Sequence, residues 1–131
     1  MSDAIYEQAI LALARSGAGA VRLDRPDVTV ECDNPLCGDR ITLDLNGDGL
    51  SITALGHKVR GCMLTKAAAA LLAQELANGT VAQADALKQA ILSVLASGAT
   101  DDPRVAMLAP VAAVRSRHDC VLLPFRALDE A

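Results

Sequence analysis

Two hydrophobic periods divide the chain, and their order sets the fold class. Between residues 27 and 59 apolar residues recur at every second position, as in Val28, Val30 and Cys32. This is the period of a half-buried strand. From residue 63 onward the chain is rich in strong helix formers. Strands followed by helices predict an α+β domain, with a small three-stranded antiparallel sheet and helices packed on one face.

Turn residues mark the limits of the expected strands. The pattern predicts strands over 27–33, 39–45 and 50–59. Asn46-Gly47-Asp48-Gly49 has the composition of a tight hairpin turn. Asp44 to Gly49 also copies the first half of a calcium loop, but Leu55 stands where the final glutamate ligand belongs. We therefore predict a hairpin at this place and no calcium site.

Capping residues mark the limits of the expected helices. Thr80 and Gln83 form a capping box that starts one helix. Together with the apolar pattern, such signals predict helices over 3–16, 63–76, 80–96, 102–108 and 120–129. The length suits a single domain. We expect this domain to cover 1–131, with an N-terminal helix in 1–20, the sheet in 21–61 and a helical part in 62–131.

Charge and aromatic content exclude several function classes. The formal net charge is −4, and Tyr6 and Phe125 are the only aromatic residues. A chain with no basic run and almost no stacking side chains is not expected to bind nucleic acid. Its first residues lack a signal-peptide pattern, and its most apolar run, 67–73, is too short to cross a bilayer. We expect a cytoplasmic protein with no membrane partner.

Three of the four cysteines fall at the ends of expected elements. Cys37 lies in a loop between two strands, Cys62 at a strand-to-helix junction and Cys120 at a loop-to-helix junction. In a reducing compartment such cysteines are more often ligands or nucleophiles than disulfide partners. Asp39 adds a carboxylate two residues after Cys37. Three thiolates and one carboxylate suit tetrahedral zinc or iron in a cluster, and residue type alone does not choose between them.

The segments around these cysteines carry three motifs. They are Asn34-Pro35-Leu36-Cys37-Gly38-Asp39-Arg40-Ile41, then Gly61-Cys62 before an alanine-rich helix, then Arg117-His118-Asp119-Cys120 with Leu122-Leu123-Pro124-Phe125. Together the motifs resemble the U-type iron–sulfur scaffold family, which includes IscU, the NifU N-terminal domain and SufU. The resemblance covers about Val21 to Glu130 and implies a SufE/NifU-like fold.

The resemblance implies a function in iron–sulfur cluster assembly. The metal ligands it implies are Cys37, Asp39, Cys62 and Cys120, with zinc or a transient iron–sulfur cluster as cofactor. A SufS-like cysteine desulfurase would deliver persulfide sulfur, and downstream assembly or acceptor proteins would receive it. The protein would then be a scaffold or a zinc-dependent sulfurtransferase rather than a classical enzyme, with Cys37 as the persulfide carrier.

Several features favour the SufU branch of this family. A second full helix is expected between Cys62 and Cys120, and Asp119 stands where the IscU branch has a histidine. Arg117 resembles a SufU-branch arginine that looks like a regulator of the reactivity of the last cysteine. Thr65 stands where the family usually has a serine.

Two alternative functions and three further residues complete the prediction. One alternative is a structural zinc-binding interaction module without sulfur transfer. The other is a thiol hydrolase in which His118 activates Cys37 or Cys120, although no nucleophile signature is present. We expect Cys32 to be a small buried hydrophobe. We expect His57 to face solvent beside Lys58. For His118, an ordinary surface histidine is favoured over a substitute ligand or proton relay.

Overall fold

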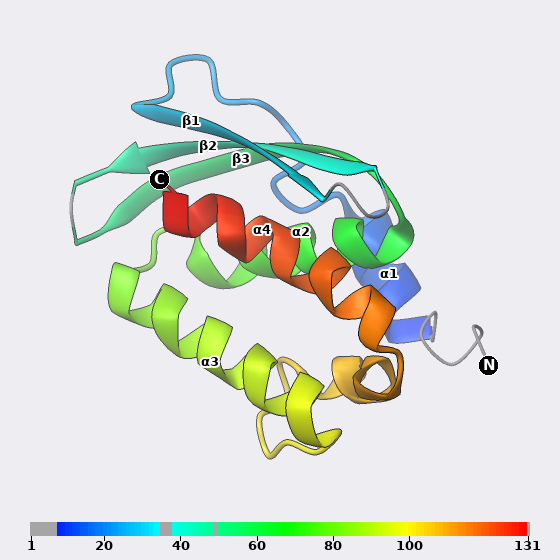
Figure 1. Ribbon diagram of the computed structural model, residues 1–131. Coiled ribbons are helices and arrows are strands. Elements are labelled where there is room, and N and C mark those ends of the chain that lie inside the picture. The colour runs from blue at the N-terminus through cyan, green and yellow to red at the C-terminus, as the bar shows by residue number, and fades with distance from the viewer. Residues whose placement is uncertain (1–7, 35–37, 49, 131) are drawn as a thin grey trace.

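A three-stranded sheet lies over a layer of helices in the computed structural model, which describes residues 8–34, 38–48 and 50–130 (Figure 1). The N-terminal helix and the helical second half of the chain lie beneath one face of the sheet. The elements in chain order are α1 (Gln8–Ser16), β1 (Val28–Asn34), β2 (Asp39–Gly47), β3 (Ile52–Arg60), α2 (Met63–Leu76), α3 (Val81–Ser97), the 3₁₀ helices η2 (Ala106–Ala113) and η3 (Arg115–Arg117), and α4 (His118–Glu130).

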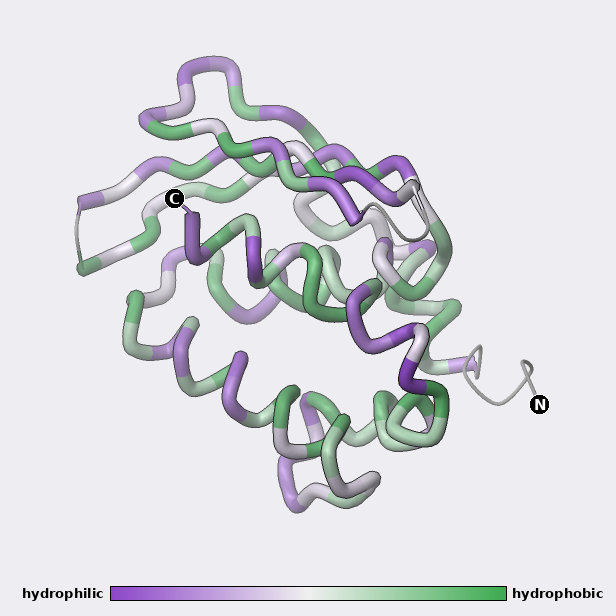
Figure 2. Tube along the Cα trace, viewed as in Figure 1, coloured by the Kyte–Doolittle hydropathy of each residue, from purple (hydrophilic) through white to green (hydrophobic). Residues whose placement is uncertain are grey.

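The sheet is a meander of antiparallel strands in the order β1-β2-β3. Hydrophobic and hydrophilic residues alternate along β1 and β2 (Figure 2), so one face of the sheet is apolar. Ile41 and Leu43 on that face are fully buried, and α2 and α4 pack against it. The predicted α+β class, with three antiparallel strands and helices on one face, is confirmed.

The connection between β2 and β3 is the predicted hairpin. Gly47 has a φ of 154°, and a Cβ there would lie 2.0 Å from the Ser51 carbonyl oxygen. Asp48 Oδ1 accepts hydrogen bonds from the Leu50 and Ser51 amides at 2.8 and 2.7 Å. In a calcium loop the Asp48 carboxylate would bind the ion, whereas here its hydrogen bonds stabilise the turn.

Helix α2 is the centre of the helical layer. It covers Met63–Leu76 as predicted, and Ala67 to Ala70 are buried because the helix contacts α1, α4 and β3. Small side chains allow this close approach. The predicted capping box of α3 is also present, since Thr80 and Gln83 exchange hydrogen bonds of 2.9 and 3.1 Å.

The prediction of an α-helix over 102–108 is wrong. Residues 102–105 form a turn in which the Asp102 carboxylate accepts from the amide of Arg104 at 2.9 Å and from its guanidinium at 2.6 Å. The following residues form a 3₁₀ helix from Ala106 to Ala113, which contains Pro110. The side-chain hydrogen bond of Asp102 to the Arg104 amide forms an Asx-type turn, which competes with an α-helix at this position. Asp102 therefore does not cap an α-helix.

The segment 21–27 crosses the outer face of the sheet and buries one carboxylate. Asp44 has 0% of its surface exposed. It accepts hydrogen bonds from Arg22 Nε at 2.6 Å, Thr29 Oγ1 at 2.6 Å and the Leu23 amide at 3.0 Å. Burial alone would raise the pKa of Asp44, but these three donors hold that pKa below its ordinary value of 3.8.

His57 was expected to face solvent, and this prediction is wrong. Its register opposite Leu43 puts it on the apolar face, with 3% of its surface exposed. The segment before β1 covers it: His57 Nε2 donates to the Ala18 carbonyl oxygen and the His57 amide to that of Gly19, both at 2.8 Å. Burial lowers the pKa of His57, although the hydrogen bond to Ala18 opposes the shift.

No helix among the described residues has the length and apolar character that crossing a membrane would require.

Candidate metal centre

Three predicted ligands come together at the end of the sheet where β2 begins and β3 ends. Asp39 is the first residue of β2, Cys62 caps the N-terminus of α2, and Cys120 lies in the first turn of α4. Their donor atoms all lie within 4.8 Å of one another, and Asp39 and Cys120 are buried while Cys62 is half-buried. Cys37, the fourth predicted ligand, lies outside the described residues.

Local backbone geometry places Asp39 and Cys62 side by side. Gly38 has a φ of 75° and its amide donates to the Asn34 carbonyl oxygen at 2.8 Å, so the chain turns just before Asp39. Cys62 is extended at φ −74° and ψ 167°, and its amide donates to Asp39 Oδ1 at 3.3 Å. The start of α2 therefore presents both a thiol and a backbone amide to the carboxylate.

Thr65 links these two ligands, and the sequence prediction missed this role. Its side chain is fully buried, and Oγ1 donates to Asp39 Oδ2 at 2.6 Å. The same oxygen lies 3.4 Å from Cys62 Sγ, which is itself 3.6 Å from Asp39 Oδ2. Positions three apart on a helix share a face, so the Cys62–Thr65 spacing is the signal that could have found it.

Arg117 and His118 lie near Cys120 but act differently. Arg117 Nη1 is 4.0 Å from Cys120 Sγ, so a guanidinium faces the predicted last thiol. His118 is half-buried rather than an ordinary surface residue. Its Nε2 donates to the carbonyl oxygens of Val111 and Ala112 at 3.1 and 3.2 Å. Among the described residues, His118 is not part of the group that could hold a metal ion.

Cys32 lies apart from this group, on the core side of β1. It is 8% exposed, and its predicted role as a small buried hydrophobe is confirmed. Burial raises the pKa of the Cys32 thiol, and the nearby Glu130 raises it further. A thiol that stays protonated is a poor ligand, so Cys32 serves as the natural control for the other cysteines.

The donor set fits a soft or borderline metal ion. Two sulfurs and one carboxylate oxygen within 4.8 Å would repel one another as anions in a buried site unless a cation lay between them. Sulfur ligands with one oxygen suit zinc, and they suit iron as well. Cys62, Cys120 and Asp39 are the described residues that would hold such an ion.

Replacing Gly61 with alanine is expected to displace Asp39. A Cβ at Gly61 would lie 2.5 Å from Asp39 Oδ1 and 2.6 Å from its Cγ, closer than atoms can approach. We expect zinc affinity of Gly61→Ala to fall by about tenfold or more in a chelator competition. Gly17→Ala is the control, because its added Cβ meets nothing within 4 Å although its φ of 65° is strained. An equal affinity loss in both variants would contradict the contact.

Removing the hydroxyl of Thr65 is expected to loosen the carboxylate. Thr65→Val keeps the shape of the side chain but leaves Asp39 Oδ2 without its 2.6 Å donor. Residues that support metal ligands contribute about tenfold to a hundredfold to metal affinity. We expect a loss in this range for Thr65→Val, measured by chelator competition, and near-normal affinity for Thr65→Ser. Equal affinities for the valine and serine variants would remove Thr65 from the site.

An α+β domain that gathers thiols and a carboxylate at the starts of a strand and two helices is a candidate metal-binding scaffold. Comparison with known proteins agrees with this class. The NifU-like N terminal domain family matches residues 6–116. The chain belongs to this family, as the sequence motifs predicted.

Individual relatives cover nearly the whole chain. The zinc-dependent sulfurtransferase SufU of Bacillus subtilis (strain 168) is 24% identical over 132 residues, which cover 98% of this chain and 89% of the relative. A crystal structure of a nitrogen-fixing NifU-like protein (N-terminal) from Brucella abortus is 28% identical, with a TM-score of 0.85 and coverage of 98% and 92%.

A third comparison concerns the fold alone. The putative iron–sulfur cluster assembly scaffold protein for the SUF system from Fervidobacterium islandicum AW-1 superimposes with a TM-score of 0.87 at 22% identity. The alignment covers 100% of this chain and 98% of the other chain.

Proposed function

We propose that this protein takes part in iron–sulfur cluster assembly, as a zinc-binding acceptor of persulfide sulfur from a cysteine desulfurase. The observation that carries the proposal is the group formed by Asp39, Cys62 and Cys120 within a NifU-like fold. The name of the Bacillus subtilis relative, a zinc-dependent sulfurtransferase, supports zinc as the ion and sulfur as the cargo. Downstream assembly or acceptor proteins would take the sulfur onward.

Within this proposal the ligands are Cys37, Asp39, Cys62 and Cys120. A bound zinc ion would hold the thiols as thiolates and keep them from pairing as disulfides. The chain's own residues act in the same direction. The guanidinium of Arg117, 4.0 Å from Cys120 Sγ, would stabilise negative charge on that sulfur.

Burial restricts which cysteine receives sulfur. Cys120 is 0% exposed, so a persulfide held by another protein does not reach its sulfur without a structural change. Cys62 is half-buried and hydrogen-bonded within the site. We assign the carrier role to Cys37, two residues before Asp39 in the sequence, in keeping with the motif that contains it.

The transfer step is a thiol–disulfide type exchange. The Cys37 thiolate attacks the outer sulfur of the desulfurase persulfide, and a new sulfur–sulfur bond forms on Cys37. The bond between the two donor sulfurs breaks, and the desulfurase cysteine leaves as a thiolate. No external oxidant or reductant takes part, because the sulfane sulfur keeps its oxidation state. Arg117 would stabilise a site thiolate that lacks its metal partner.

A persulfide assay on a cysteine series tests the function. The purified protein is analysed for zinc, then mixed with a SufS-type desulfurase and cysteine, and the added sulfur is located by mass spectrometry. We expect sulfur on Cys37 in the unmodified chain and in Cys32→Ser, and none in Cys37→Ser. A protein that binds zinc and accepts no sulfur would be a structural module. Thiol-ester hydrolysis by metal-free protein would instead indicate a hydrolase.

A further inference from the structure

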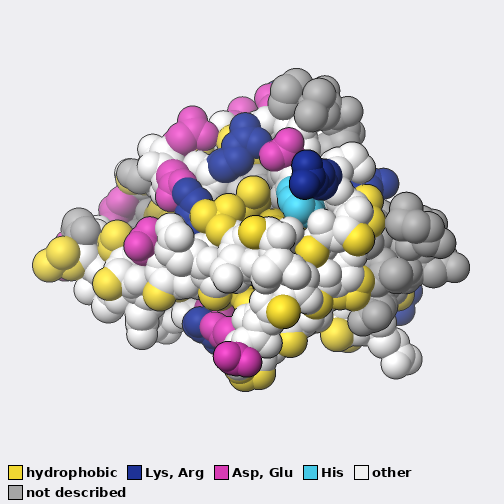
Figure 3. Space-filling model, turned by 60° about the horizontal axis from the view of Figure 1, so that its bottom comes forward, with side chains coloured by type: hydrophobic (Ala, Val, Ile, Leu, Met, Phe, Trp, Pro, Cys, Tyr) yellow, Lys and Arg dark blue, Asp and Glu magenta, His cyan; other side chains and the backbone are white. Residues whose placement is uncertain are grey.

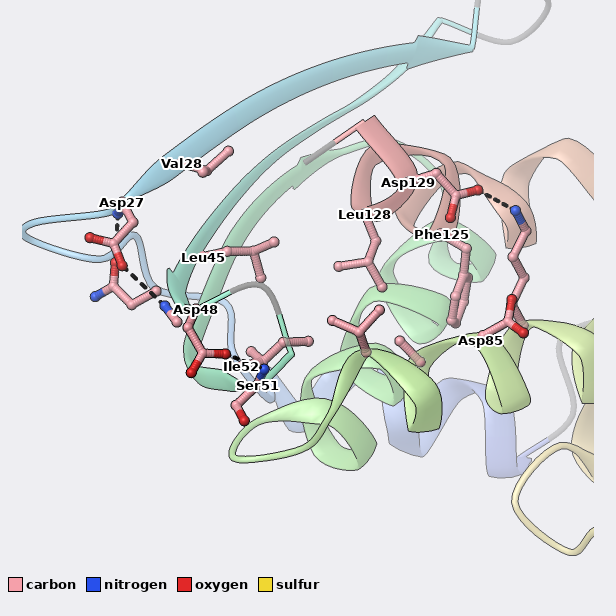
Figure 4. Close-up of a pocket in the computed structure, with 15 residues that line it drawn as sticks. Asp27, Val28, Leu45, Asp48, Ser51, Ile52, Asp85, Phe125, Leu128 and Asp129 are labelled. Atoms are coloured by element: carbon pink, nitrogen blue, oxygen red, sulfur yellow. Dashed lines mark hydrogen bonds and ion pairs between the residues drawn. The ribbon is translucent and has the colours of Figure 1, made fainter.

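A cavity lies at the opposite end of the sheet from the metal centre. The centre lies where β2 begins and β3 ends, whereas the cavity lies beside the β2–β3 hairpin. Its volume is about 390 Å³, and β1, β2, β3, α3 and α4 all contribute to its wall (Figure 4). A volume of this size accommodates one or two large side chains or a small ligand.

The inner wall of this cavity, which we call the hairpin pocket, is apolar. The sheet and helices α3 and α4 contribute the apolar side chains Val28, Leu45, Ile52, Val81, Ala84, Phe125 and Leu128. Figure 4 shows Leu45 and Ile52 from the sheet facing Phe125 and Leu128 from α4. An apolar group that entered the pocket would therefore lose its contact with water on several sides.

The rim of the hairpin pocket is strongly acidic. Four aspartates and one lysine line it, and the lysine, Lys88, is already paired with Asp129. Asp27 and Asp48 accept hydrogen bonds from backbone amides of the turn. Within the described part of the chain, no cationic side chain lies within ion-pair distance of Asp27, Asp48 or Asp85. In Figure 3, acidic side chains lie among hydrophobic and basic ones on the left half of the face in view.

These carboxylates are too dispersed for a metal ion. Among the described residues, the only group of ligands close enough to hold one is Asp39 with Cys62 and Cys120. The negative charge of the rim therefore matches several cationic groups spread over a surface rather than a single ion.

Exposed apolar side chains continue the apolar surface of the hairpin pocket beyond its rim. Val28 is 40% exposed, Val81 49% and Leu50 77%, and they account for three of the five large exposed hydrophobic residues in the described ranges. Val28 and Val81 line the pocket, and the Val81 amide donates to the Leu50 carbonyl oxygen at 2.9 Å. Clustered exposed apolar side chains with a polar rim are typical of a protein interaction site.

We infer that the hairpin pocket is a docking site for a segment of a partner protein that inserts a large apolar side chain flanked by lysine or arginine. The apolar wall would take the inserted side chain, and Asp27, Asp48 and Asp85 would pair with the flanking cations. The site lies at the other end of the sheet from the metal centre, so a bound partner segment would leave that centre uncovered.

A peptide selection on the full-length protein tests this site. A phage-displayed library of random short peptides is selected on the unmodified chain and counter-selected on Ala84→Leu, which adds bulk to the pocket wall. We expect selected peptides to share one or two large apolar residues next to lysine or arginine. Their binding, measured by fluorescence anisotropy, should weaken as salt is raised.

Charge reversal supplies the matched comparison. Asp85 is exposed and lines the pocket, whereas Asp24 is exposed and lies outside its lining. We expect Asp85→Lys to lower the affinity for the selected peptides by about fivefold to tenfold. Asp24→Lys should change that affinity by less than about twofold. Zinc content should be unchanged in both variants, which shows that the fold is intact.

Four outcomes would overturn the inference. One is that the selected peptides lack basic residues, and another is that Asp85→Lys and Asp24→Lys lower the peptide affinity equally. The third is the absence of any peptide that distinguishes the unmodified chain from Ala84→Leu. Self-association that Asp85→Lys abolishes would make a second copy of the chain the occupant, and would equally reject a basic partner segment.

Discussion

The Cys62→Ser variant is expected to bind zinc at least about a hundredfold more weakly than the unmodified protein. Cys62 Sγ lies 3.6 Å from Asp39 Oδ2 and 3.4 Å from Thr65 Oγ1, so the substitution changes the contacts of both neighbours. A serine hydroxyl is a much weaker zinc ligand than a thiolate at neutral pH. Metal analysis after purification and competition with a chelator measure the loss.

Cys32→Ser is the matched control for this prediction. It makes the same chemical change at a buried cysteine of β1 that does not belong to the metal group. We expect its zinc content to equal that of the unmodified chain, even if its stability is lower. Unchanged zinc content in Cys62→Ser would remove Cys62 from the site.

The Asp44→Ala variant is expected to lose about 3 kcal/mol of unfolding free energy. Asp44 is fully buried and accepts four hydrogen bonds, two from Arg22, one from Thr29 and one from the Leu23 amide, so the variant loses all four. Urea unfolding at neutral pH, followed by circular dichroism, measures the change. Asp24→Ala, at an exposed carboxylate of the same segment, should change the unfolding free energy by less than about 0.5 kcal/mol.

The contribution of Asp44 should also depend on pH in a defined direction. Its pKa in the folded protein lies below the ordinary value of 3.8, so its stabilising effect is complete above that value. As pH falls through the lower folded-state pKa, the carboxylate is protonated and the advantage is lost. The difference in stability between the unmodified chain and Asp44→Ala should therefore shrink below pH 3.8. A difference that grows on acidification would contradict the assignment.

The features that local sequence signals control were predicted well. Period-two alternation gave the three strands, and the limits of α2 match the prediction because Gly61 and Asn78-Gly79 enclose a run of strong helix formers. The placement of Cys62 and Cys120 at element starts followed from the same map. Because these cysteines stand at element starts on the same end of the fold, their side chains lie close to each other and to Asp39.

The features that depend on distant segments were not predicted. His57 is buried because Ala18 and Gly19 cover it, and this contact between remote residues has no local signature. Asp44 is buried for the same reason, under Arg22 and Leu23. Thr65 was noted only as a departure from the family's usual serine, since its hydrogen bond to Asp39 becomes visible only when β2 and α2 are placed together.

The three described candidate ligands belong to segments that are far apart along the chain, one on β2, one at α2 and one on α4. An ion held between them would bind the folded chain and not the unfolded one, so it would raise the free energy of unfolding. Thermal denaturation would then report directly on occupancy of the metal centre. A chain without its ion would differ from an ion-bound one in how readily its helical layer separates from the sheet.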